Sequence, residues 1–450
     1  MAASLSFLAD PREWFTDLKT AVFAKARLNE VMVCGIDADF CEFARVSHSE
    51  LVQASRVEHV SFHLSTGYGT RRIGASLTLP TEIREAKLLV FHELDRLRAW
   101  LDSIPEDPFF VEWSDVSESA ESSMVLATPV ESFYEDFRKI SSDLDVVGLY
   151  ASGPMMSGWA TSIGHFHWTA THRYFFDFSV YVAGDKAAKD FVSGPSWDKD
   201  SYAGKIVRAR TTVDVLARPP IAVPTGKLRA IFSAEAVSDL LSLSCWGGYS
   251  ARAHLTGDSP FERLKKDQKR LSDRVTLYDD LARFGLPRVQ DQGYLRSDRF
   301  DLVKDGRMVN WYCSPRTAKE FGIHHNSAAS GESPGGFVLD CGEMQECDTL
   351  ERLDTGLYVS NLWYLNFSDR YQAGVTGMTR FASMWVENGR MVGPIEPLRF
   401  NDSLFDLLGD KLLALGDTQE VFEHTSTYGH RARGGVACPK ALVQDLQIVS

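Results

Sequence analysis

The sequence predicts an α+β fold, in which an N-terminal domain of helices on a sheet is followed by a β-rich C-terminal domain. Near the N-terminus, apolar residues recur at spacings of three and four, as on one face of a helix. Residues 174–182 instead place apolar side chains at every second position, as a strand does. Beyond residue 290 the pattern indicates hairpins, with Asp305-Gly306 and Asn388-Gly389 as turns.

The division into two domains rests on one segment in the middle of the chain. Residues 217–226 hold three prolines and a glycine, which is typical of an interdomain linker. We therefore expect an N-terminal α/β domain at residues 1–216 and a β-rich domain at residues 227–450. The length of 450 residues is consistent with one to three domains.

Two helices are predicted in the N-terminal domain. Asp10 is a good capping residue, Pro11 suits the first turn, and Glu13 lies three residues after the cap. The apolar face of this first helix consists of Trp14, Leu18, Ala21 and Val22. A longer helix is predicted at residues 81–101. Its apolar stripe consists of Ile83, Ala86, Val90, Leu94, Leu97 and Leu101.

The remaining elements are predicted from turn residues and local periodicity. Residues 31–79 are expected to form short strands. Three glycines would mark turns among them, namely Gly67, Gly69 and Gly74. After the linker, we expect a helix at residues 232–243 and a charged, interrupted helical stretch at residues 261–284.

The balance of charge counts against a nucleic-acid partner. Asp and Glu number 61 against 48 Lys and Arg, which gives a net charge of -13. Such a surface repels a polyanion over most of its area. The hydrophobic share of 44% and the charged share of 24% are ordinary for a folded globular protein.

Cysteine usage and hydropathy predict a cytoplasmic protein. The closest cysteine pairs are Cys34/Cys41 and Cys341/Cys347, and neither has the two-residue gap of a zinc knuckle or redox motif. Free thiols in a reducing compartment are therefore expected. The N-terminus has no basic stretch before an apolar core, and no apolar run approaches ~18 residues. We expect neither a signal peptide nor a membrane span.

The densest histidine group contains His165, His167 and His172, and it has two interpretations. On a strand, His165 and His167 point to the same side, where they would form part of a metal site or a polar wall facing a substrate. Alternatively, they form one polar face of a strand whose other face buries Phe166 and Trp168.

His92 and Glu93 are adjacent, as are the first two residues of a zincin motif. Arg96 and Leu97 occupy the positions where a second histidine would be needed. We therefore interpret His92 and Glu93 as part of a solvated helix face, with Arg96 nearby.

Four motifs follow one another in the C-terminal third. They are G-L-Y-V-S-N-L at residues 356–362, G-V-T-G-M-T-R at 374–380, F-A-S-M-W-V-E-N-G at 381–389 and R-F-N-D-S-L at 399–404. In this order they resemble the TldD/PmbA family. The middle of the chain resembles it as well, in Asp291-Gln292-Gly293 before a strand and in T-A-K-E-F-G at residues 317–322.

The resemblance directs attention to one helix. Active TldD-like members carry H-E-x-x-x-H on a helix and a further cysteine ligand near the C-terminus. The matching segment here places Ala234 and Asp239 at the two histidine positions and Glu235 at that of the general base. Cys438 lies near the position of the C-terminal cysteine ligand in those members. Catalytic zinc normally takes three protein ligands, so the resemblance implies no metal in this chain.

The resemblance therefore implies a TldE-like, non-catalytic subunit that forms a heterodimer with a zinc-bearing TldD-like metallopeptidase. The two chains would enclose a chamber for peptide proteolysis or for the maturation of a peptide natural product. Arg380, His165 and His167 are the candidates for residues near that chamber. Zinc is the implied cofactor and belongs to the partner, while self-association of this chain is left open.

Two alternatives remain open at this point. The chain is a self-sufficient, divergent metallohydrolase if Glu235, Asp239 and Cys438 form its site. It is a non-enzymatic scaffold if it serves a biosynthetic pathway. In the least functional interpretation, the two carboxylates are ordinary positions on a surface helix and Cys438 is a buried thiol.

Overall fold

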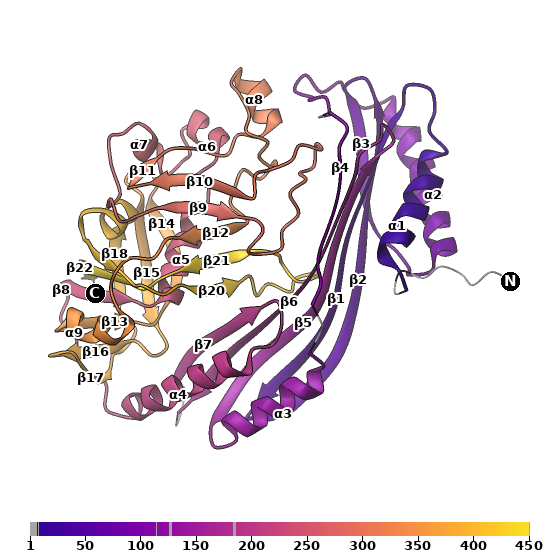
Figure 1. The fold of residues 1–450 in the computed structure, drawn as a ribbon. Coiled ribbons are helices and arrows are strands. Elements are labelled where there is room, and N and C mark those ends of the chain that lie inside the picture. Colours follow the sequence, from indigo (N-terminus) through magenta and orange to yellow (C-terminus); the bar gives the residue numbers. More distant parts are fainter. Residues whose placement is uncertain (1–6, 8, 114, 126–127, 183–185, 450) are drawn as a thin grey trace.

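The computed structural model describes residues 7, 9–113, 115–125, 128–182 and 186–449, which form a mixed α+β protein with three sheets. The N-terminal sheet has the order β3-β2-β1-β5-β6-β4, and β7 pairs with β6 beyond the end of β4. Figure 1 shows it as a tall, curved sheet. Its strands are β1 (Val31–Ser47), β2 (Glu50–Tyr68), β3 (Arg71–Thr78), β4 (Glu118–Ser123), β5 (Asp145–Thr161), β6 (Phe166–Tyr181) and β7 (Ala187–Gly194).

The prediction of short strands at residues 31–79 is wrong, because β1 and β2 contain 17 and 19 residues. They stay in antiparallel register from Val31↔Gly67 to Ser47↔Glu50, with one irregularity. Of the three predicted turn glycines, Gly67 and Gly74 lie inside strands, and Gly69 makes the turn with a φ of 54°. A Cβ at Gly67 would lie 2.0 Å from the carbonyl oxygen of Arg71, so close backbone approach requires glycine there.

Four helices cover one face of this sheet, two at each end (Figure 1). They are α1 (Pro11–Phe23), α2 (Ile83–Leu101), α3 (Val130–Ser141) and α4 (Lys199–Leu216). Both predicted helices are confirmed. The Asp10 carboxylate accepts the N–H of Glu13 at 2.8 Å, and the predicted apolar stripe of α2 is buried. Burial of these stripes against the sheet supplies most of the stability of such amphipathic helices.

One residue of α2 departs from its predicted position. His92 is exposed as expected, but Glu93 is buried. Its carboxylate accepts a hydrogen bond from Nε of Arg96 at 2.8 Å, and this bond lowers the pKa of Glu93. The guanidinium therefore satisfies a carboxylate that the helical pattern alone would place in solvent.

The opposite face of the sheet turns toward the C-terminal half and carries charged side chains. Arg431, which follows β20, reaches this face and is buried there together with Asp39. Its Nε donates to Asp39 Oδ1 at 2.9 Å, and its guanidinium also donates to the carbonyl oxygens of Arg173 and Gly153. Arg173 in turn donates to the carboxylate of Glu423. These charges join the two halves of the chain.

Two further sheets build the C-terminal half, with the strand orders β11-β10-β9-β12-β21-β20 and β14-β15-β18-β22-β8-β13-β16-β17. The first contains β9 (Leu277–Asp280), β10 (Arg299–Lys304), β11 (Arg307–Met308), β12 (Gly336–Leu339), β20 (Glu420–Glu423) and β21 (Gly435–Cys438). The second contains β8 (Gly226–Phe232), β13 (Gly356–Val359), β14 (Asn361–Asp369), β15 (Gly374–Arg380), β16 (Met384–Glu387), β17 (Arg390–Pro394), β18 (Arg399–Ser403) and β22 (Ala441–Val449), with β19 (Leu412–Leu415) paired to β22.

Helix α5 (Ala234–Ser244) lies between these two sheets in a large hydrophobic core. Its sequence is apolar on most sides, which suits a helix that is covered on both faces. Ala236, Leu240 and Leu241 are fully or almost fully buried. The helix predicted at residues 232–243 is thus confirmed with small shifts at its ends.

The helical stretch predicted at residues 261–284 is mostly wrong, because only α7 (Glu262–Lys265) is helical and β9 closes the segment. Asp267 has a φ of 54°, a conformation that a continuing right-handed helix does not contain. Leu271 then donates its N–H to Gly306, in the next hairpin, at 3.0 Å. Tertiary pairing with that hairpin therefore prevails over local helical propensity.

Both predicted hairpin turns are confirmed. Asp305 and Gly306 have φ values of 48° and 72°, and Asn388 and Gly389 have 48° and 73°. Two consecutive left-handed residues match the twist of the flanking strands, which is why these dipeptides are strong hairpin signals. The remaining helical segments are α6 (Ala251–Thr256), α8 (Pro315–Phe321), α9 (Thr349–Leu353), a 3-10 turn at Glu346–Asp348 and a π turn at Asp406–Asp410.

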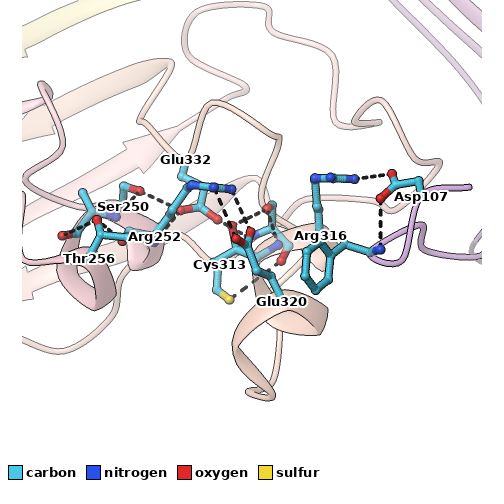
Figure 2. Close-up of polar contacts among 12 residues, drawn as sticks. Asp107, Ser250, Arg252, Thr256, Cys313, Arg316, Glu320 and Glu332 are labelled. Carbon is cyan, nitrogen blue, oxygen red and sulfur yellow. Dashed lines mark hydrogen bonds and ion pairs between the residues drawn. The ribbon is translucent and has the colours of Figure 1, made fainter. Parts of the chain in front are cut away.

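Helix α8 provides another connection between the two halves (Figure 2). Arg316, on this helix, forms an ion pair with Asp107, which lies in the segment after α2. The backbone carbonyl oxygen of Phe110 accepts a hydrogen bond from Lys319. The segment that follows α2 is therefore fastened to the C-terminal half by two cationic side chains from one helix.

A buried carboxylate positions α8 itself. Glu332 accepts hydrogen bonds from the hydroxyl of Ser250 at 2.7 Å and from the backbone N–H groups of Arg252 at 2.9 Å and Ser314 at 2.8 Å (Figure 2). Burial raises the pKa of Glu332, but these bonds outweigh it and the net pKa is lowered. One carboxylate thus accepts backbone N–H groups at the N-terminal ends of both α6 and α8, which have no partner within their own helix. No helix in the described ranges is long and apolar enough to cross a membrane.

Candidate functional site

The candidate site is built on the first turns of α5. Ser233 caps the helix, since its hydroxyl oxygen accepts the N–H of Ala236 at 3.1 Å. Glu235 follows in the first turn, where the positive end of the helix dipole favours a carboxylate. Asp239 lies four residues later, so both carboxylates project from the same face of the helix.

A lysine from the N-terminal sheet faces these carboxylates. The Nζ atom of Lys189, on β7, lies 3.0 Å from Asp177 Oδ1 and 3.7 Å from Glu235 Oε1. Asp239 adds a weaker attraction, and together these carboxylates raise the pKa of Lys189 despite its burial. The ammonium therefore stays charged between three acidic side chains.

Burial gives the two helix carboxylates unusual acidities. It raises the pKa of Glu235 from 4.5 to about 7, against the opposing effects of Lys189 and of a hydrogen bond from Asn361. It also raises the pKa of Asp239 from 3.8 to about 6. The N–H of Leu362 donates to Asp239 Oδ2 at 3.2 Å and limits that shift. Both groups titrate near neutral pH, as a general acid or base must.

Cys438 lies next to the start of α5 but is not disposed as a ligand. It is fully buried on β21, and its thiol donates to the carbonyl oxygen of Ala234 at 3.1 Å. Burial raises its pKa far above the ordinary value, with a further contribution from Glu420. A metal ion would have to displace this thiol proton from its hydrogen bond with Ala234.

These residues do not fit a catalytic zinc ion. Ala234 offers no side-chain donor atom, and the ammonium of Lys189 lies 3.7 Å from Glu235 Oε1, where its charge opposes a metal cation. A zinc site with His, Cys or carboxylate ligands needs at least three such groups pointing at one ion. Among the residues described, no group of three or more His, Cys, Asp or Glu side chains is placed to hold one.

Glu235 lines a cavity of about 660 Å³ between the two halves of the chain. Its walls come from β7 and α4 on one side and from α5, α9 and β20 on the other. Lys205 bridges Asp190, 2.6 Å away, and the carboxylate of Glu420. The cavity is within the size range of sites for small ligands or a few peptide residues.

Two of the predicted chamber residues lie elsewhere. His165 and His167 are buried near Trp159, and His167 Nδ1 is 2.8 Å from the hydroxyl of Ser119. Burial, reinforced by His165, lowers the pKa of His167 to about 4. Twelve residues of β6 separate His167 from the partner of Lys189 in the ladder, Ser179, which corresponds to ~40 Å along a strand. These histidines are therefore not part of the α5 site.

Arg380, the third predicted chamber residue, lies close to α5. It pairs with Asn361 in the ladder between β14 and β15, and Asn361 also donates to Glu235. Sequence reasoning did not identify Lys189 or Asp177. Asp177 was visible as a polar position within an apolar strand, whereas nothing in the sequence around Lys189 signals its partners.

Comparisons with known proteins agree with this architecture. A family model described as the PmbA/TldA metallopeptidase C-terminal domain matches residues 225–450, half of the chain. No curated protein matches the chain. Among solved structures, TldE from Thermococcus kodakarensis superposes with a TM-score of 0.75 at 14% identity, covering 98% of this chain and 99% of that one.

Two bacterial structures, each described as a candidate modulator of DNA gyrase, share the fold as well. The one from Thermotoga maritima has a TM-score of 0.74 at 14% identity and covers 97% of this chain and 100% of that chain. The one from Bacteroides thetaiotaomicron has a TM-score of 0.72 at 15% identity and covers 98% of both chains. At such identities these likenesses establish the fold alone.

Fold and site together define an α+β protein with a carboxylate-bearing helix beside a cavity between its two halves. The chain belongs to the PmbA/TldD family of metallopeptidases, as its sequence motifs predicted. Its whole length follows the fold of TldE.

Proposed function

We propose that this chain is a non-catalytic, TldE-like subunit that pairs with a TldD-like zinc metallopeptidase. The observation that supports this most directly is the composition of the α5 site. Ala234 stands at a ligand position of the family motif, and the ammonium of Lys189 lies against Glu235. A positive charge in that place opposes the approach of a divalent cation.

In this role the chain contributes the wall of a peptide chamber, and the partner contributes the zinc and the hydrolytic water. The cavity of about 660 Å³ beside α5 supports the idea of space for peptide on this side of the complex. The same chamber serves either general peptide proteolysis or the maturation of a peptide natural product. The location that follows from this proposal is the cytoplasm.

The test is coexpression of the tagged chain with an untagged TldD-like protein encoded in the same genome. We expect the pair to copurify as a heterodimer with ~1 zinc per pair, and the isolated chain to hold less than ~0.1 zinc. Peptide hydrolysis should require both chains. A stable, active chain that binds no TldD-like protein would contradict the proposal, and the mass of the isolated chain in solution would show whether it also self-associates.

A second candidate is a self-sufficient hydrolase that uses Glu235, Asp239 and Cys438. One observation favours it, namely the pKa of Glu235 at about 7, a value suited to a general base. The isolated chain would then hydrolyse peptides, and Glu235→Gln would abolish that activity. A scaffold in a biosynthetic pathway is the third candidate, and biosynthetic genes next to this one, in place of a TldD-like gene, would favour it.

A further inference from the structure

A second cavity, of about 430 Å³, is lined in part by Phe381, whose ring centre lies 5.9 Å from the Nζ atom of Lys189. It is lined by the end of β15 and the residues after it, by Pro394–Pro397, and by Tyr181, Lys186 and Leu216 from the N-terminal half. Cavities at the junction of two parts of a chain, in this size range, are common binding sites.

The guanidinium of Arg380 is the distinctive polar group of this cavity. Its Cζ atom lies 3.7 Å from the centre of the Trp363 ring and 5.1 Å from that of Phe381. Within the described ranges, no carboxylate lies within 4.0 Å of Arg380, in contrast to Arg98, Arg173 and Arg431. Stacking holds the plane of the guanidinium in place and leaves its N–H groups free at the edge.

Two aromatic residues that line the cavity have a left-handed backbone conformation. Tyr364 and Phe381 have φ values of 50° and 54°, which bulky residues rarely adopt. Between Trp363 and Asn366 the pairing of β14 with β15 is interrupted, and Tyr364 is 76% exposed. Such local strain is typical of ligand-binding segments and persists only where the surroundings impose it.

The charges in the cavity favour an anionic ligand. Lys186 contributes a second cation, whose Nζ donates to the carbonyl oxygens of Leu216 at 3.3 Å and Arg218 at 3.4 Å. Among the described residues of the lining, Glu396 is the one carboxylate, and it is exposed to solvent. A planar guanidinium matches a carboxylate with two parallel hydrogen bonds, and the aromatic rings beside it suit an apolar side chain.

From these observations we infer that the cavity around Arg380 binds the terminal carboxylate of a peptide. The guanidinium of Arg380 holds the carboxylate, and Trp363, Tyr364 and Phe381 contact the last side chain. The ladder pair Asn361↔Arg380 places the two side chains on the same face of the sheet, and Asn361 reaches Glu235. A peptide anchored here therefore extends toward the α5 cavity. The choice of a peptide as ligand rests on the proposed function.

The experiment compares two probes on the full-length chain by calorimetry. One is N-acetyl-tetraalanyl-phenylalanine with a free carboxylate, and the other is the same peptide as its C-terminal amide. The free acid should bind at least ~10-fold more tightly than the amide. Arg380→Ala should reduce binding of the acid to the level of the amide and leave the amide unaffected, which also shows that the variant is folded. Arg380→Lys should give an intermediate affinity.

Arg390→Ala is the matched control, because Arg390 is an exposed arginine on the same sheet outside this cavity, and it should change neither affinity. Equal binding of acid and amide, or no binding of either, would overturn the inference. So would displacement of the acid by an equal concentration of inorganic phosphate, which would indicate a general anion site. The measurement uses this chain alone, so its result is independent of whether a TldD-like partner binds.

Discussion

Glu235→Gln should make the protein more stable at pH 8 than the wild type. The pKa of Glu235 is raised from 4.5 to about 7, so the folded state favours the protonated carboxyl. The stability that this group contributes is fully present below pH 4.5 and is lost as the pH rises through about 7. At ~1.4 kcal/mol for each tenfold change, the loss is about 3 kcal/mol. Glutamine resembles the protonated acid and does not ionise, so it avoids this loss.

The assay is urea unfolding of both proteins between pH 5 and pH 8. Between pH 5 and pH 8 the variant should gain about 2–3 kcal/mol relative to the wild type, most of it below about pH 7. Titrating groups that do not interact with Glu235 affect both proteins alike and cancel in the difference. Glu351→Gln, at an exposed position in the lining of the same cavity, is the control and should show no such trend. Parallel stability curves for wild type and Glu235→Gln would refute the reasoning.

Lys189 provides an internal check on this account, because its ammonium lowers the pKa of Glu235. In a Lys189→Met background the pKa of Glu235 should rise further, so the divergence between Glu and Gln at position 235 should still begin near pH 4.5 but continue to a higher pH and grow larger. Unchanged curves in this background would mean that the ammonium does not act on Glu235.

Two further predictions concern the connection between the halves and the thiols. Arg431→Met should destabilise the protein by about 3–5 kcal/mol in urea, because Asp39 is left buried without a counter-charge. In an Asp39→Asn background the same substitution should cost much less, and equal costs would argue against the pair. A thiol reagent should label Cys341 and Cys347, which are exposed, in the native chain. Cys438 should react only after unfolding, and its rapid labelling in the native state would contradict its burial.

Local signals in the sequence predicted the elements that local physics determines. The cap at Asp10, the apolar stripe of α2 and the turn at Asn388-Gly389 depend on residues within a few positions of one another. The lengths of β1 and β2 were missed, because a strand extends as far as its partner stays paired. The prediction of a helical stretch at residues 261–284 was wrong for the same reason, because this segment forms hydrogen bonds with a hairpin that lies later in the chain.

The candidate site shows the same limit of local reasoning. The family motif placed Glu235 and Asp239 on one helix face, but the interpretation of both as ordinary surface positions does not hold for Glu235, whose side chain is 19% exposed. Its counter-ion comes from another sheet. Asp177 and Lys189 meet because β6 pairs with β7, and both meet Glu235 because the two halves of the chain pack together. The contacts among these three side chains therefore cannot be predicted from residue spacing in the sequence.

Burial raises the pKa of both α5 carboxylates toward neutral pH, and the ammonium of Lys189 offsets only part of that shift. A buried carboxylate needs a nearby positive charge or a proton. Three carboxylates, those of Asp177, Glu235 and Asp239, share one ammonium, whereas a divalent cation in the same place would supply twice the charge. The missing charge is supplied by a proton, which is the physical meaning of a pKa of about 7 for Glu235 and about 6 for Asp239. In this chain a lysine and, below about pH 7, a proton on Glu235 together balance these buried carboxylates.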